Sequence, residues 1–433
     1  MRATAGAMAV WLAGASSAAA HHGIINFDLN REIQITGTVT QLRLVNPHSW
    51  LHLDVIDANG TVTKWRCELR GASVLRRSGW SADMFAAGTK VTITGAPDRF
   101  TPNTCYLATA VFSDGRRVDR YGQLRAAAPA AGDSTALPPR PARRPDGRPN
   151  LAGDWAAEQR MLSDPRGISG AFVPLSVAKK LEPGAVPEGM QAFPGARGTA
   201  ASLADNPVET FWNRPSAFPL TAAGKQAIAT FDGGSTDNPR LRCEPTNILF
   251  DWSFESDVNR ITQADDRITL LYGSMNLERT IHLGVTEHPR DVAPTRAGHS
   301  IGRWEGDVLV VETIGFEPGI LSADARIPHS NQLRVTERFT LDPEKGTLTR
   351  SYVAEDPLYL EKPFTGADTV QVADVPYQRT DCDDQSYKTT KTEDASAPAD
   401  SGTPRWLIWG GAFVAVGIAL LALMRLPRRP GAA

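Results

Sequence analysis

Short runs of alternating apolar and polar residues, separated by turn signals, constrain the fold of this chain more than any other feature. Trp50–Ile56 alternates, the turn Asp57-Ala58-Asn59-Gly60 follows, and Thr61–Leu69 alternates again. This succession is typical of a β-hairpin. Further alternating or apolar runs occupy 267–272, 277–283, 307–313, 333–341 and 347–353. The pattern predicts a mainly β protein.

Two low-complexity stretches, 126–149 and 390–405, divide the 433-residue chain into separate folding blocks. The first block, 21–125, and the second, 150–389, are each long enough to bury a core. Lys and Arg number 46 and Asp and Glu number 48, so the formal net charge is −2. This balance argues against a nucleic-acid partner.

The two ends of the chain predict its compartment. Residues 1–20 carry one arginine, an apolar stretch, and Ala18 and Ala20 before the expected cut, as secretory signals do. Residues 406–424 are apolar or small and would span about 28 Å as a helix, enough to cross a bilayer. Arginines in the tail 425–433 favour a cytoplasmic end. We expect a single-pass inner-membrane protein with its body in the periplasm; the alternative is a sorting tail that is later removed.

The four cysteines fit an oxidising compartment. Cys67 and Cys105 lie in the first block, and Cys243 and Cys382 lie in the second. Four cysteines allow three pairings. The block division favours Cys67–Cys105 and Cys243–Cys382, with free buried thiols as the alternative.

The first block has the strand order of a five-stranded OB barrel. Strand signals at 33–44, 50–56 and 61–69 precede a short helix at 72–77, and strands at 90–94 and 105–112 follow. A split sandwich is the alternative. Alternation places four polar side chains on the outer face of the second and third strands, where OB barrels bind ligands. These are His52, Asp54, Arg66 and Glu68. A merely solvated polar face is the other interpretation.

Several motifs in the first block occur in an order that resembles a known family. They are His21-His22, ITGTVTQLRLVNPHSWLHLDV at 35–55, Trp65 with Glu68, LRRSGW, and SDGR. Together they resemble a proteobacterial family of exported proteins of unknown function. The resemblance implies an exported β domain without assigning an activity. It also marks Asn46, Pro47 and His48 as candidate functional positions, beside His21 and His22.

The second block is predicted to form a larger antiparallel β barrel or sandwich. Gly153 and Trp155 begin it with a Gly-x-Trp pattern, 160–219 carries no sustained period and is expected to be loops, and 221–231 is a helix candidate. The motifs LRCEP at 241–245, HSIGRWEGDVLVVETIGF at 299–316 and PHSNQLRVTERF at 328–339 resemble a second family of uncharacterised exported bacterial proteins.

Two charged residues fall on apolar strand faces of this block. Arg279 shares a face with Leu277 and Ile281, and Glu337 shares one with Val335. An unpaired buried ion costs several kcal/mol, so the pattern predicts an internal Arg279–Glu337 pair. The alternative is a polar anchor inside a ligand cavity. His299 and His329 flank these strands and are interpreted as loop or capping residues.

No GxSxG, Walker, HExxH, CxxC or CxxCH motif is present, so the sequence favours binding over catalysis. The candidate ligand residues are His48, His52, Asp54, Arg66, Glu68, Arg279 and Glu337. The partner would be a small molecule or an envelope protein. One alternative is copper held by His21 and His22 at the mature N-terminus, since Cu(II) favours nitrogen ligands. Another is a hydrolase or isomerase that uses a cavity of the second block.

The topology can be tested directly. Alkaline phosphatase fused after residue 389 should be active, because the signal and the arginine-flanked apolar run place that position outside the inner membrane. The same fusion after residue 433 should be inactive. An inactive fusion at 389 would overturn the predicted orientation.

Overall fold

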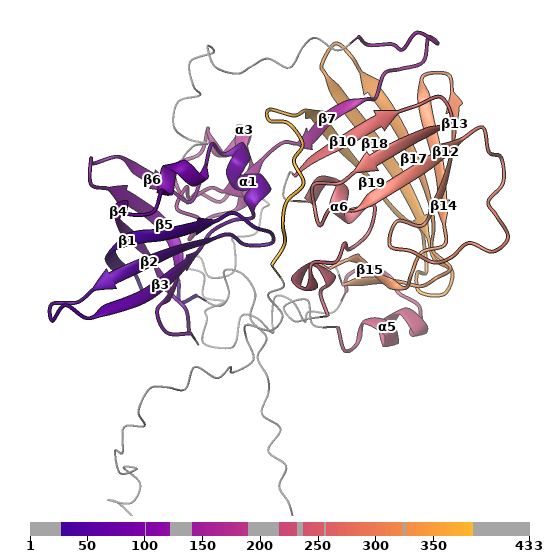
Figure 1. Cartoon of the computed structure of the whole chain (residues 1–433). Helices are drawn as coiled ribbons and strands as arrows, with labels where there is room; N and C mark the ends of the chain where they lie inside the picture. Colours follow the sequence, from indigo (N-terminus) through magenta and orange to yellow (C-terminus); the bar gives the residue numbers. More distant parts are fainter. Residues whose placement is uncertain are drawn as a thin grey trace, which may run out of the picture. The chain divides into compact units, whose positions relative to one another are not determined.

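The computed structural model describes residues 27–99, 101–121, 141–188, 216–231, 237–254, 257–323 and 326–383. They contain two closed β barrels (Figure 1). The predicted signal at 1–20, His21, His22 and the apolar run 406–424 lie outside the described residues. Within them, no helix is long and apolar enough to cross a membrane.

The small barrel is built from five strands that close on themselves. Its elements are β1 (Ile33–Arg43), β2 (Trp50–Ile56), β3 (Val62–Glu68), α1 (Ala72–Arg77), η2 (Ala82–Phe85), β4 (Lys90–Pro97), β5 (Thr104–Phe112) and β6 (Arg117–Asp119). The pairing order is β3-β2-β1-β4-β5, and a parallel β3–β5 pairing closes the ring. The five-stranded barrel expected from the sequence is therefore confirmed, with a short sixth strand added at β5.

The β2–β3 hairpin shows how local sequence fixes this barrel. The Asp57 carboxylate accepts hydrogen bonds from the backbone N–H groups of Asn59 and Thr61, both at 2.8 Å. Gly60 has a φ of 84°, a conformation that L side chains rarely adopt. The turn thus sets the hairpin register in which Leu51 and Leu53 face the core.

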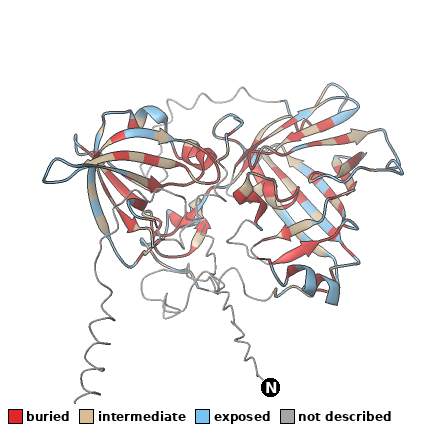
Figure 2. Cartoon of the chain, turned by 60° about the horizontal axis from the view of Figure 1, so that its bottom comes forward, coloured by how far each residue is buried: buried red, intermediate tan, exposed pale blue. Residues whose placement is uncertain are grey.

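A nine-stranded barrel forms the second block. Its strands are β7 (Gly153–Ala157), β10 (Val258–Gln263), β11 (Arg267–Leu271), β12 (Glu278–Leu283), β13 (His299–Glu305), β14 (Val308–Ile314), β17 (Arg334–Asp342), β18 (Thr347–Glu355) and β19 (Phe364–Val372). Pairing of β7 with both β10 and β19 closes the ring. Buried and exposed residues alternate along these strands (Figure 2).

Three expectations for this block need correction. The barrel is not wholly antiparallel, because β12 and β13 pair in parallel and a long connection at 284–298 joins them. The stretch 160–219 is not loop alone, since it contains β8 (Arg160–Leu162), β9 (Phe172–Pro174) and α3 (Leu175–Ala178). The helix expected at 221–231 is shorter: α5 (Ala222–Ile228) begins after Thr221, whose hydroxyl accepts the Gly224 N–H.

Both predicted disulfides are present. Cys67 and Cys105 are cross-strand partners on the parallel β3–β5 pairing, so their bond joins the strands that close the small barrel. Cys243 follows η3 (Pro239–Arg242), and its partner Cys382 lies after the last barrel strand. The second bond spans a sequence separation of 139 residues.

The segment after β19 lies against the small barrel. Backbone hydrogen bonds of 2.9 Å join the Asn46 N–H to the Asp381 carbonyl and the Asp383 N–H to the Asn46 carbonyl. The Arg77 guanidinium pairs with Asp374 at 2.8 Å. The Cys243–Cys382 bond therefore anchors a segment that contacts both barrels.

Replacing Cys382 with Ser should lower the free energy of unfolding by about 4–5 kcal/mol, because the crosslink restricts a loop of this length in the unfolded chain. Urea denaturation of the wild type and the variant measures the difference. Non-reducing peptide mapping provides the control, and a free thiol at Cys243 in the wild type would contradict the pairing.

Candidate functional site

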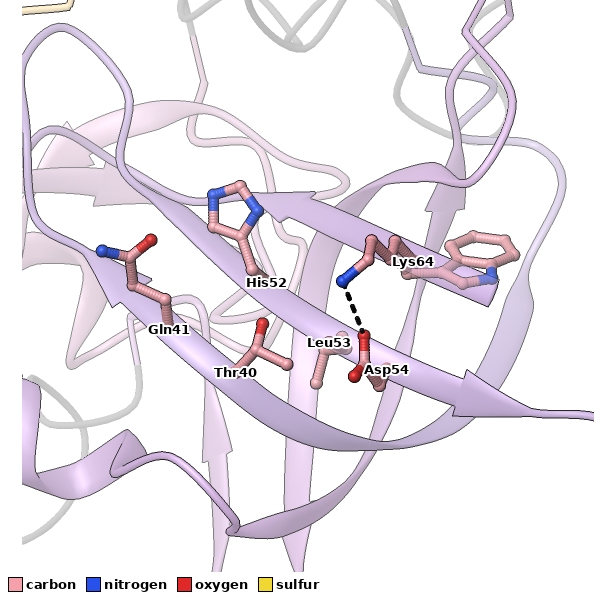
Figure 3. Close-up of a pocket in the computed structure, with 7 residues that line it drawn as sticks. Thr40, Gln41, His52, Leu53, Asp54 and Lys64 are labelled. Carbon is pink, nitrogen blue, oxygen red and sulfur yellow. Dashed lines mark ion pairs between the residues drawn. The ribbon is translucent and has the colours of Figure 1, made fainter. Parts of the chain in front are cut away.

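A surface pocket of about 330 Å³ lies over the first three strands of the small barrel (Figure 3). It is lined by Thr40, Gln41, His52, Leu53, Asp54, Lys64 and Trp65. His52 and Asp54 were both expected on this face from the alternation of β2. The lining is mostly polar, because the side chains of Leu53 and Trp65 pack toward the barrel core.

Strand register explains why these side chains meet. His52 stands opposite Gln41 of β1, and Asp54 stands opposite Lys64 of β3. The β1–β2 register shifts between Val39 and Gln41, which leaves Thr40 as an extra residue. Such bulges bend a strand and redirect its side chains, often beside binding sites.

Charge in the pocket comes from one weak ion pair. The Lys64 ammonium lies 3.7 Å from the Asp54 carboxylate, and the dashed line of Figure 3 marks this pair. The Lys64 side chain is 87% exposed and that of Asp54 is 34% exposed. Exposed ion pairs contribute about 0–1 kcal/mol to stability. A ligand that offers better hydrogen bonds can therefore replace the Lys64 ammonium beside Asp54 at little cost in free energy.

Arg66 lies on the same hairpin but does not line the pocket. Its guanidinium carbon is 4.8 Å from the centre of the Trp50 ring, and its Nε donates to the Thr104 hydroxyl at 3.4 Å. Burial lowers the pKa of Arg66, while Asp98 and Glu68 act in the opposite direction. The side chain therefore packs along the strands.

The burial of Glu68 is the largest difference from the sequence prediction for this barrel. Glu68 was predicted on an outer face, but it is only 3% exposed. Its carboxylate lies 3.6 Å from His48 Nδ1 and 3.6 Å from the Arg120 guanidinium. Arg120 in turn stacks 3.8 Å above the Tyr106 ring. His48 and Glu68 thus belong to a buried cluster beneath later strands, which single-strand alternation cannot reveal.

The Arg279–Glu337 pair lies inside the large barrel. Arg279 donates to Glu337, to Ser300 Oγ at 2.9 Å and to Thr313 Oγ1 at 2.8 Å. Arg350 approaches the second Glu337 oxygen at 3.3 Å. Neither Arg279 nor Glu337 has an exposed side-chain surface.

Arg350 extends this network toward the segment that precedes β10. Its guanidinium donates to the carbonyls of Ile248 and Leu249, at 2.8 and 2.9 Å, and pairs with Asp368 at 2.5 Å. Burial lowers the pKa of Arg279, but the Glu337 carboxylate outweighs this and the pKa is raised. The pair is therefore an enclosed ionic contact between strands.

The large barrel also carries an imidazole cluster that was not predicted from the sequence. Three of the eight histidines of the chain fall within residues 282–299. His299, interpreted as a loop or capping residue, begins β13, where its ring stacks on that of His282 with centroids 5.0 Å apart. His288 Nδ1 lies 2.8 Å from His299 Nδ1. The high density of histidines in this range was the sequence feature from which the cluster could have been predicted.

His329, the other histidine given a loop interpretation, ends β16 (Ile327–His329), which pairs with β15 (Gly319–Ser322). It is only 2% exposed. Burial lowers its pKa to about 4, although the Ser330 carbonyl and Asp356 act in the opposite direction. A histidine held neutral in this way is a packed interior residue.

The copper residues proposed from the sequence, His21 and His22, lie outside the described part of the chain. Within that part, no three His, Cys, Asp or Glu side chains are arranged to hold a metal ion.

Comparison with known proteins yields one match. A model described as "Family of unknown function (DUF6152)" matches residues 10–105, which include most of the small barrel and its pocket. This match supports the expectation that the first block belongs to a domain family of unknown function, and its exported character stays a prediction. No curated protein and no solved structure matches the chain. The resemblance of the second block to another family stays a prediction.

Replacing Glu337 with Gln should destabilise the protein by about 3–5 kcal/mol, because two buried guanidinium groups lose their shared carboxylate. Urea denaturation gives the free energy of unfolding. The matched control is Glu305→Gln, which removes a carboxylate that pairs with Arg303 and Arg338 on the exposed surface. Equal effects of the two substitutions would contradict a special role for the buried network.

Proposed function

We propose that this chain is an exported binding protein, anchored in the inner membrane by residues 406–424 with its body in the periplasm. The secretory signal pattern at 1–20 and the arginine-flanked apolar run support this location. The pairing of all four cysteines in disulfides is consistent with it, because such bonds persist in oxidising compartments.

The pocket over β1, β2 and β3 is the proposed ligand site. The observation that carries this proposal is the convergence of His52, Asp54, Gln41 and Lys64 in one hollow. It lies on the strand face that five-stranded OB barrels use for oligonucleotides and oligosaccharides. A bulge at its edge and a weakly held carboxylate give the pocket hydrogen-bonding groups that a ligand can take over.

The chemistry of the lining favours a neutral, hydroxyl-rich ligand of the carbohydrate class. Asp54 accepts hydrogen bonds, Gln41 both donates and accepts, and the His52 ring nitrogens can do either. The pocket pairs one cation with one anion, and the chain carries a net charge of −2, so neither favours a polyanion. A saccharide uses such groups without needing a charge partner.

Copper binding through His21 and His22 is a separate proposal that rests on the sequence alone. The cavity-based hydrolase or isomerase gains no support from Arg279 and Glu337, because both side chains are enclosed and bonded to each other. A partner protein in the envelope would be an alternative occupant of the same pocket.

Calorimetric titration of the mature chain in detergent with N-acetylglucosamine oligomers tests the ligand class. Titration of the wild-type protein should give a heat of binding that reaches saturation. Asp54→Asn should weaken binding roughly 10- to 100-fold, because a hydrogen bond to a charged group contributes about 1.5–3 kcal/mol.

Lys90→Ala is the control, since Lys90 is exposed at the start of β4 and does not line the pocket. It should bind like the wild type. Absence of saturable heat in the wild type would refute the carbohydrate assignment. Equal affinity in Asp54→Asn would refute the pocket as the site.

A further inference from the structure

The outer surface of the large barrel carries a pair of imidazole groups in direct contact. His299 begins β13, and His288 belongs to the connection 284–298 that joins the parallel strands β12 and β13. Their Nδ1 atoms are 2.8 Å apart, with ring centroids separated by 5.1 Å and ring planes at 71°. Both residues are partly exposed.

Barrel alternation explains why the pair faces outward. Arg279 and Ser300 point into the barrel, where they bond each other, so His282, three positions after Arg279, and His299, one before Ser300, point out. His282 stacks on His299 with a ring-plane angle of only 15°. This stacking supports the His299 ring on one side and leaves its Nδ1 directed at His288.

The two facing nitrogens hold at most one proton between them when both rings are neutral. Burial and then the charge of His299 and Arg334 lower the pKa of His288, while Glu312 raises it. Burial and then His282 lower the pKa of His299. Imidazole binds metals through a deprotonated ring nitrogen. His288 Nε2 is buried and has no hydrogen-bond partner among the described residues.

We propose that His288 and His299 form a Cu(II) site on the large barrel, with both Nδ1 atoms as ligands in adjacent positions. A metal–imidazole bond is about 2.0 Å long, so two ligands at right angles lie about 2.8 Å apart. Tetrahedral ligands would lie about 3.3 Å apart. The 2.8 Å separation between the two nitrogens matches the square-planar arrangement that Cu(II) favours.

Water completes the site. Over the described ranges, no third His, Cys, Asp or Glu joins the pair in an arrangement that could hold an ion. Two imidazoles and two waters make an open, exchangeable site. All four cysteines are in disulfides, so no thiol of the chain competes for copper or reduces it. The site is separate from the proposed saccharide pocket and from His21 and His22.

Cu(II) titration of the mature chain tests this assignment. The parent protein for all measurements carries His21→Ala and His22→Ala and no oligohistidine tag, so that copper at the N-terminus is not counted. It should bind one equivalent of Cu(II), and its electron paramagnetic resonance spectrum should show splitting from two nitrogens. Saturating Cu(II) should raise the unfolding temperature, because an ion that binds only the folded state stabilises it.

His288→Phe and His299→Phe, each added to the parent, should lose this equivalent, the nitrogen splitting and the stabilisation. His282→Phe is the matched control: it keeps the stacked ring and removes a histidine that is not a ligand, so copper binding should persist. Unfolding temperatures without copper establish that each variant is folded. The proposed site would be refuted if the parent protein bound no copper, or if either ligand variant still bound it. Loss of copper in His282→Phe would overturn the two-ligand arrangement.

Discussion

The large barrel depends on one carboxylate held between two arginines. Glu337 on β17 meets Arg279 on β12 and Arg350 on β18, all inside a ring of strands. Removing three charges from water costs several kcal/mol for each ion, and only mutual pairing with further hydrogen bonds offsets this cost. Ser300, Thr313 and two backbone carbonyls supply those bonds. The network therefore stabilises one strand register over its alternatives.

This interior arrangement determines what the outer surface presents. Side chains alternate along a strand, so fixing Arg279 and Ser300 inside places His282 and His299 outside. The parallel pairing of β12 and β13 needs a long connection, and that connection brings His288 to His299. The proposed copper ligands are thus a consequence of the same register that the buried ions select.

Closure of the small barrel divides the polar residues of the β2–β3 hairpin into a buried group and an exposed group. The parallel contact of β3 with β5, joined by Cys67–Cys105, brings later residues over one end of the hairpin. Glu68 is covered there by Arg120, whereas Asp54, near the other end, stays partly exposed in the pocket. One alternating face therefore yields both a buried ion cluster and an open candidate binding surface.

Local pattern in the sequence determined the β class, the hairpin at Asp57–Gly60, the helix at 72–77 and the order of the small-barrel strands, because these features depend on near neighbours. It also predicted the Arg279–Glu337 contact, since a charge on an apolar face requires a partner. Both cysteine pairings followed from the division into blocks. Tertiary structure alone decided the rest: the burial of Glu68, the parallel β12–β13 pairing and the meeting of His288 with His299. Each of these arises from contacts between segments whose relative position is set only when the strands close into barrels.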